Sequence, residues 1–105
     1  MIAVAGHQVE LLESAEGYLR RATPSRPACL VLDVRMPGMG GLELQRALKA
    51  TPHEVPIVFI TGRRDQGTRT RAISGGAVAV LDKPVDSAEL LSAIAGALKL
   101  SLKTD

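Results

Sequence analysis

The chain has 105 residues, with 13 basic and 11 acidic side chains, one cysteine, one tyrosine and one phenylalanine. This length suits one domain with its own core, and the interspersed charges and scarce aromatic residues argue against a nucleic-acid partner. One cysteine excludes an internal disulfide. The lack of a basic leader and of an apolar run of about 20 residues predicts a cytoplasmic protein with no membrane span.

The N-terminal half alternates between short apolar runs and helical patterns. A strand is predicted near 8–12, and a helix near 14–22 follows because Ser14 is a favourable N-cap before apolar residues with helical spacing. The run at 28–33 is apolar and β-branched up to its last residue, which is typical of a strand buried on both faces of a parallel sheet. A loop rich in proline and glycine follows, and the next periodicity predicts a helix near 41–50.

The C-terminal half repeats this alternation. An apolar, β-branched run predicts a strand near 56–61, and a weakly apolar helix is expected near 67–75 after a polar loop. Another strand is predicted near 77–82, and the clearest helical periodicity of the chain lies near 86–99. Strands separated by helices of this length indicate βαβ units and a parallel α/β sheet.

Three polar residues directly follow or end apolar strands: Asp33, Thr61 and Lys83. Parallel strands bring such residues to one edge of a sheet, which is where ligands bind in open α/β folds. A carboxylate can attack phosphorus, and a hydroxyl and an ammonium can hold the transferred group. Mg²⁺ is expected with such chemistry, and Asp33 supplies one carboxylate for it. Each residue taken singly also suits a simpler role, as a turn former, a helix cap or a solvated strand end.

The stretches 30–44, 56–62 and 76–84 carry a family resemblance. Over about residues 5–99 the chain resembles bacterial response regulator receiver domains, which are CheY-like, and in particular those of the FixJ/NodW type. The resemblance implies a flavodoxin-like parallel sheet with alternating helices. It also implies that Asp33 is the phosphoacceptor, Thr61 the switch hydroxyl and Lys83 its ion partner. A cis peptide bond is implied before Pro84, and the backbone carbonyl of Arg35 is implied as a magnesium ligand.

The chain departs from the family pattern in two places. Receiver domains begin with a central strand that ends in an acidic pair, and by the resemblance residues 1–5 correspond to the end of the first helix, so the first strand, most of that helix and the acidic pair are expected to be absent. Glu10 matches neither acid. Val80 stands where the family carries a switch aromatic residue. One arrangement that fills the gap left by the first strand pairs strand 8–12 directly with strand 28–32 in a four-stranded sheet, and a second is association with another chain. Impaired binding of Mg²⁺ is expected.

Three functions remain open from the sequence. The first is a phosphorylatable receiver served by a histidine kinase, with no enzymatic activity of its own. The second is a phosphorylation-independent module that acts by protein interaction, as a homodimer or strand-exchanged oligomer, because an uncovered sheet face and edge invite association. The third and most remote is a haloacid-dehalogenase-type phosphohydrolase, whose first motif would need an acid where Arg35 stands.

Overall fold

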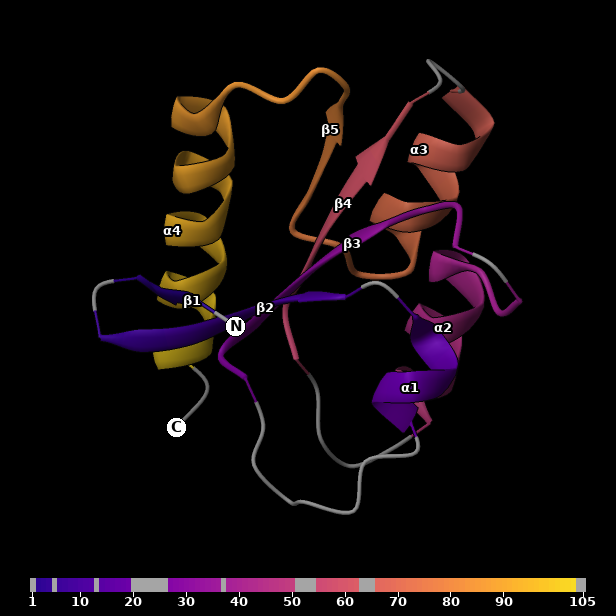
Figure 1. Ribbon diagram of the computed structural model, residues 1–105, viewed down its shortest axis with the longest axis horizontal. Coiled ribbons are helices and arrows are strands. Elements are labelled where there is room, and N and C mark those ends of the chain that lie inside the picture. Colours follow the sequence, from indigo (N-terminus) through magenta and orange to yellow (C-terminus); the bar gives the residue numbers. More distant parts are fainter. Residues whose placement is uncertain are drawn as a thin grey trace.

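The computed structural model describes residues 2–4, 6–12, 14–19, 27–36, 38–50, 55–62 and 66–103. Strands and helices alternate along most of this length (Figure 1). In chain order the elements are β1 (Ile2–Val4), β2 (His7–Leu12), α1 (Ala15–Leu19), β3 (Cys29–Asp33), α2 (Gly41–Lys49), β4 (Ile57–Thr61), α3 (Gln66–Ser74), β5 (Ala79–Asp82) and α4 (Ser87–Lys103).

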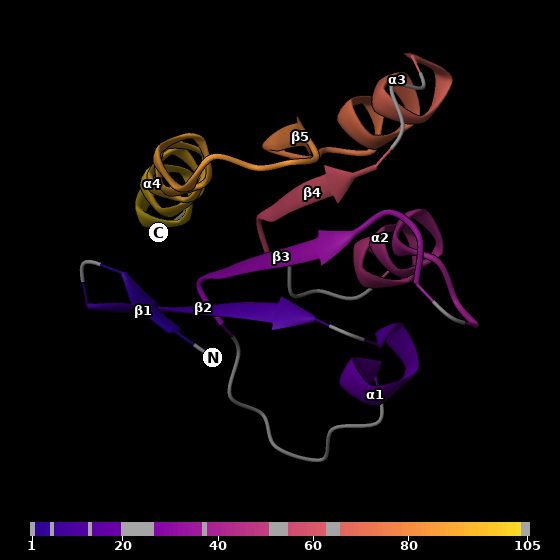
Figure 2. The ribbon, with the colours of Figure 1, turned by 45° about the horizontal axis from the view of Figure 1, so that its top comes forward.

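The strands form one five-stranded sheet in the order β1-β2-β3-β4-β5. Strands β2 to β5 run parallel, and α1, α2 and α3 connect successive members of this set, so the expected parallel α/β fold is confirmed (Figure 2). None of the described helices has the length and apolarity that a membrane crossing requires.

The N-terminal segment differs from the expectation. Residues 1–5 were predicted to end a helix, whereas Ile2–Val4 forms β1, which pairs antiparallel with β2. Val4 lies opposite His7, and Gly6 adopts a φ of +83° in the turn between the two strands, a conformation that glycine tolerates at little cost. Pairing with β2 thus sets the conformation of a segment too short to define its own periodicity, and the sheet has five strands rather than four.

Strand β2 pairs directly with β3, as predicted, from Val9 opposite Cys29 to Leu12 opposite Leu32. The strands predicted near 8–12, 28–33, 56–61 and 77–82 are observed as β2 to β5 within the bounds given above. The helix predicted near 14–22 is observed as α1, in which Gly17 donates its N–H to Ser14 Oγ at 3.1 Å. Residues 20–22 of that prediction lie outside the described residues.

Apolar side chains alternate between the two faces of the sheet and form two clusters. The larger cluster joins β2 to β5 with α1, α2 and α3, and the smaller one lies under α4 (Figure 2). The larger cluster contains Leu12, Ala15, Leu30, Leu32, Met36, Leu44, Leu48, Ile57, Phe59, Ala72 and Val80. The smaller one contains Val9, Cys29, Val31, Val58, Ile94, Ala97 and Leu98. Strand β3 contributes to both, so its carboxyl end is held from either side.

Candidate functional site

The site lies at the carboxyl edge of the three neighbouring parallel strands β3, β4 and β5. Asp33 is the last residue of β3 and is half-buried, whereas the four residues before it are buried. Thr61 ends β4, is buried, and lies opposite Asp82 in the register with β5. Lys83 follows β5 directly. Because β4 lies between β3 and β5, the fold gathers the three predicted residues at one edge.

Two donors engage the Asp33 carboxylate. The Lys83 ammonium donates a hydrogen bond to Oδ2 and forms an ion pair with it. The backbone N–H of Arg35 donates to Oδ1 at 2.9 Å. Lys83 is also tied to the middle strand, because its backbone N–H donates to the carbonyl of Thr61 at 2.8 Å. The structure thus brings Asp33 and Lys83 into side-chain contact and links Thr61 to Lys83 through the backbone.

The pKa of Asp33 lies below its ordinary value. Partial burial by itself raises this pKa, but the hydrogen bonds from Lys83 and the Arg35 N–H, and the positive charges of the two residues, outweigh it. Asp33 is therefore a carboxylate at neutral pH, which is the form a nucleophile requires. The peptide bond between Lys83 and Pro84, expected in cis, is cis.

The loop after Asp33 is fixed by contacts that the sequence did not reveal. Val34 donates its N–H to the carbonyl of Ile60 at 3.0 Å, and Gly41 donates to the carbonyl of Val34 at 2.9 Å. Glu16 from α1 accepts the N–H of Met39 at 3.0 Å through Oε1. The sequence gives no sign of this contact, since the two residues are 23 positions apart and no local pattern joins them.

Few metal-binding side chains reach this edge. Within the described ranges, no three His, Cys, Asp or Glu side chains gather closely enough to hold a metal ion. Glu10 is buried in β2 opposite Leu30, three residues before Asp33 on β3, and so lies away from the edge. Asp33 and Asp82 are the carboxylates that end β3 and β5 at this edge, and Asp82 is paired with Arg69. Asp33 and, nearby in the chain, the backbone carbonyl of Arg35 are thus the candidate oxygen donors beside Lys83.

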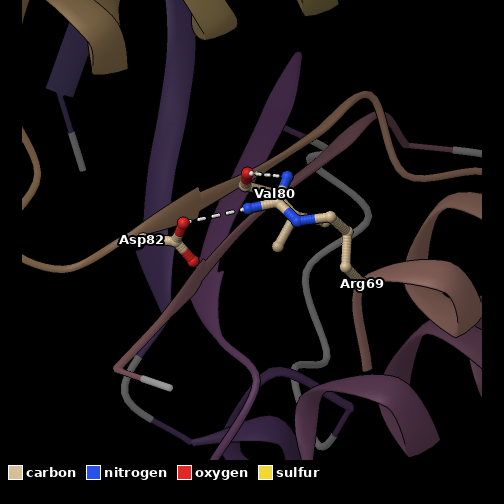
Figure 3. A network of polar contacts seen from close by, with 3 residues as sticks. All are labelled: Arg69, Val80 and Asp82. Atoms are coloured by element: carbon tan, nitrogen blue, oxygen red, sulfur yellow. Dashed lines mark hydrogen bonds and ion pairs between the residues drawn. The ribbon is translucent and has the colours of Figure 1, made fainter. Parts of the chain in front are cut away.

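Position 80 carries no aromatic side chain, and an arginine contacts its backbone instead. Val80 is buried in β5 as part of the larger cluster. Arg69 of α3 bonds to the carbonyl of Val80 and to the carboxylate of Asp82 (Figure 3). The sequence predicts only a basic, solvated or partner-facing helix surface for Arg69, because an arginine in such a helix cannot be told from a solvated one until the fold is known.

These features define a three-layer α/β domain, with α1, α2 and α3 on one face of the sheet and α4 on the other, and with a charged site at the carboxyl edge of the sheet. The sequence matches the response regulator receiver domain family over residues 1–95. The chain belongs to this family, whose members serve as receiving modules of two-component signalling.

Curated relatives and solved structures agree with this family. The chain is 44% identical over 101 residues to the response regulator protein TodT of Pseudomonas putida, a match that covers 96% of this chain and 44% of TodT. It is 42% identical over 98 residues to nodulation protein W of Bradyrhizobium diazoefficiens, covering 93% of this chain and 43% of that protein. The chain therefore spans less than half the length of these relatives.

Among solved structures, the crystal structure of FixJ-N superimposes with a TM-score of 0.80 at 28% sequence identity. The superposition covers 89% of this chain and 94% of that one. The predicted CheY-like fold is thereby confirmed, although β2 and β3 are direct neighbours here.

Proposed function

We propose that this domain receives a phosphoryl group from a histidine kinase on the Asp33 carboxylate, with Lys83 and Thr61 holding the transferred group. The observation that carries the proposal is the contact between Lys83 and the ionised Asp33 at the shared edge of β3, β4 and β5. Family membership supports a signalling role over catalytic turnover, and hence over a phosphohydrolase.

The transfer is a substitution at phosphorus. One oxygen of the Asp33 carboxylate forms a bond to phosphorus while the bond to the donor breaks, and the donor group leaves with that electron pair. The product is an acyl phosphate. Lys83 exchanges the carboxylate for a phosphoryl oxygen as the negative charge moves outward, and the Thr61 hydroxyl donates to another oxygen.

The donor set fits a weak magnesium site. Mg²⁺ is commonly held by one or two carboxylates together with phosphate oxygens and water, and here Asp33 and the Arg35 carbonyl would serve. When bound, the ion offsets the charge on the phosphoryl oxygens. Because no three acidic or other metal-binding side chains gather among the described residues, and the second carboxylate of this edge, Asp82, is paired with Arg69, we expect phosphorylation that is slow and needs high magnesium concentrations.

The test is incubation with acetyl phosphate over a range of magnesium concentrations, followed by measurement of the intact mass. We expect the addition of one phosphoryl group to the unaltered chain and none to Asp33→Asn. Asp86→Asn removes an exposed carboxylate near the start of α4 and is the matched control, which should be phosphorylated like the unaltered chain. An adduct that persists in Asp33→Asn overturns the proposal.

A second candidate is a phosphorylation-independent module that acts as a homodimer. Two observations favour it: Val80 lacks the switch aromatic ring, and Leu11 of β2 is 49% exposed although its strand lies in the sheet. Sedimentation of the unaltered chain and of Asp33→Asn distinguishes the two functions. Equal dimerisation of both proteins supports the second candidate, and a monomeric mass at micromolar concentration contradicts it.

A further inference from the structure

A polar cluster lies beside the candidate site, on the face of the sheet that carries α3. Arg69 donates from Nη1 to the carbonyl of Val80 at 2.9 Å and pairs through Nη2 with Oδ2 of Asp82 at 3.1 Å (Figure 3). Val80 and Asp82 are two residues apart in β5, so both lie on the same face. The rigid guanidinium fork suits two acceptors at this spacing. We call this cluster the Arg69 clasp.

The clasp holds the segment that brings Lys83 to Asp33. Asp82 immediately precedes Lys83 in the chain, and it lies opposite Thr61 in the register of β4 and β5. The Lys83 N–H bonds to the Thr61 carbonyl at 2.8 Å. A shift of either Thr61 or Lys83 toward a new partner would therefore move the Asp82 carboxylate that is paired with Arg69.

Helix α3 buries little apolar surface. Ala72 is the one buried residue among those of α3, and the other described anchor from the core side is Gln45 Nε2, which donates to the Ala72 carbonyl at 2.9 Å. One methyl group buries little apolar area, so apolar packing contributes little to the docking of this helix. The position of α3 consequently depends on polar bonds, and the clasp provides two of them.

We propose that Arg69 is a positioning residue that couples the Lys83 end of β5 to α3, so that the state of Asp33 is conveyed to the exposed surface of α3 through the guanidinium. This inference rests on the proposed function. Arg69 thereby takes the part expected of an aromatic side chain at position 80, since the small, buried Val80 offers no ring that could rotate. On phosphorylation, the Lys83 ammonium moves from the Asp33 carboxylate to a phosphoryl oxygen. The neighbouring Asp82 shifts with the backbone, and Arg69 either moves with the Asp82 carboxylate or loses its ion pair with it. Because such coupling is reciprocal, loosening the clasp also changes how firmly Lys83 is held.

A double-mutant cycle read by amide hydrogen exchange of α3 tests the coupling without phosphorylation. Lys83→Met removes the partly exposed ion pair with Asp33 that holds the end of β5, and it should speed the amide exchange of residues 66–74 about two- to fivefold. In an Arg69→Met background the same change should have no further effect. Equal effects of Lys83→Met in both backgrounds overturn the proposal.

Two further variants separate coupling from mere support of the helix. Arg71→Met removes an exposed guanidinium from the same helix and should leave the response of α3 to Lys83→Met intact. Arg69→Lys keeps the charge but loses the fork, and it should restore only part of the coupling. A full response in Arg69→Lys would assign the effect to charge alone and contradict a clasp.

Phosphorylation by acetyl phosphate provides the second arm, with uptake measured by mass in the same samples. Phosphorylated wild-type chain should show altered exchange in α3, whereas phosphorylated Arg69→Met should not. If the wild-type chain takes up no phosphoryl group, the proposed function fails, and the Lys83 cycle still decides the coupling. If both phosphorylated proteins respond alike, the coupling fails while the proposed function stands.

Discussion

Asp33 and Lys83 meet at one edge of the sheet, but the regions that deliver them are built differently. β3 is buried over its first four residues, and α2 beside it buries Leu44 and Leu48. β5 has one buried residue, Val80, and α3 likewise has one, Ala72. The Asp33 side, which we call the acceptor side for the role proposed above, is thus the more fully buried one. On the Lys83 side, called the ion-partner side, β5 makes fewer buried apolar contacts and adds the polar contacts of Arg69 and Lys83.

The difference suits the chemistry that we propose. The side chains of Lys83, Arg69 and Asp82 are 52%, 38% and 37% exposed, so water screens their ion pairs and each contributes little to stability. Contacts of this kind can exchange partners at little cost in free energy. A nucleophile on a rigid base, faced by a cation that can move, is the arrangement that a reversible acyl phosphate requires.

The largest expected change in stability comes from comparing a buried side chain of α2 with a half-exposed one of α3. Leu44→Ala empties a fully buried site in the larger cluster and should lower the free energy of unfolding by about 2–5 kcal/mol. Ile73→Ala truncates a side chain that is 48% exposed on α3, and the change should stay within about 0.5 kcal/mol. Urea denaturation measures both. Comparable losses in the two variants would contradict the difference between the regions.

The next prediction concerns access to β3 from the side of α4. Cys29 is fully buried, and desolvation raises the pKa of its thiol from 9.0 to about 11. At pH 8 this shift alone lowers the thiolate fraction about 100-fold, so alkylation of the folded chain should be slower by at least that factor than alkylation of the chain in urea. Rapid alkylation of Cys29 in the folded protein would mean that the start of β3 becomes accessible to solvent through local unfolding.

Two glycine-to-alanine substitutions should change the free energy of unfolding in opposite directions. A Cβ at Gly41 would lie 2.7 Å from the carbonyl oxygen of Asp33 and 2.9 Å from Cε1 of Phe59, so Gly41→Ala must displace α2 or the acceptor strand and should cost about 1–3 kcal/mol. A Cβ at Gly96 in α4 meets nothing within 4 Å, and Gly96→Ala should stabilise by up to about 1 kcal/mol through helix propensity. Thermal and urea unfolding check both. An unchanged free energy of unfolding in Gly41→Ala would show that α2 and β3 can move apart more easily than their packing indicates.

The sequence predicts the acceptor side better than the ion-partner side. Apolar, β-branched runs that end in Asp33 and Thr61 carry both the strand and the site in one local pattern. Lys83 follows by the same logic. The role of Arg69 could not be predicted, because its acceptors at Val80 and Asp82 lie 11 and 13 residues away and only the packing of α3 on β5 brings them within reach.

The N-terminal segment was predicted wrongly for a related reason. Three residues, Ile2 to Val4, cannot establish either a helical or a strand periodicity, and the prediction followed the resemblance to receiver domains instead. The neighbouring strand decides the outcome, since β2 offers an edge that β1 can pair with through a tight turn at Gly6. Tertiary pairing outweighs local preference where the segment is this short.

The smallest expected effect tests the contact between the two regions. The pKa of Asp33 is lowered in the folded chain, so its ion pair stabilises the fold above about pH 3.9, the pKa expected in the unfolded chain, and this contribution disappears as the pH falls through the folded-state pKa. Lys83→Met removes the ammonium and leaves the burial, so the pKa of Asp33 should rise. Because Lys83 is half exposed, the loss of stability at pH 7 should stay below about 1 kcal/mol.

Carboxyl NMR titration and urea denaturation between pH 3 and pH 7 measure this effect, with Lys49→Met as the control that removes an exposed ammonium from α2. The control should leave the pKa of Asp33 unchanged. An unchanged pKa of Asp33 in Lys83→Met would mean that the N–H and the charge of Arg35 lower it without Lys83, and that the Lys83 ammonium does not interact with the Asp33 charge. A raised pKa with little loss of stability is the combination that identifies Lys83 as an ion partner free to move to the phosphoryl group.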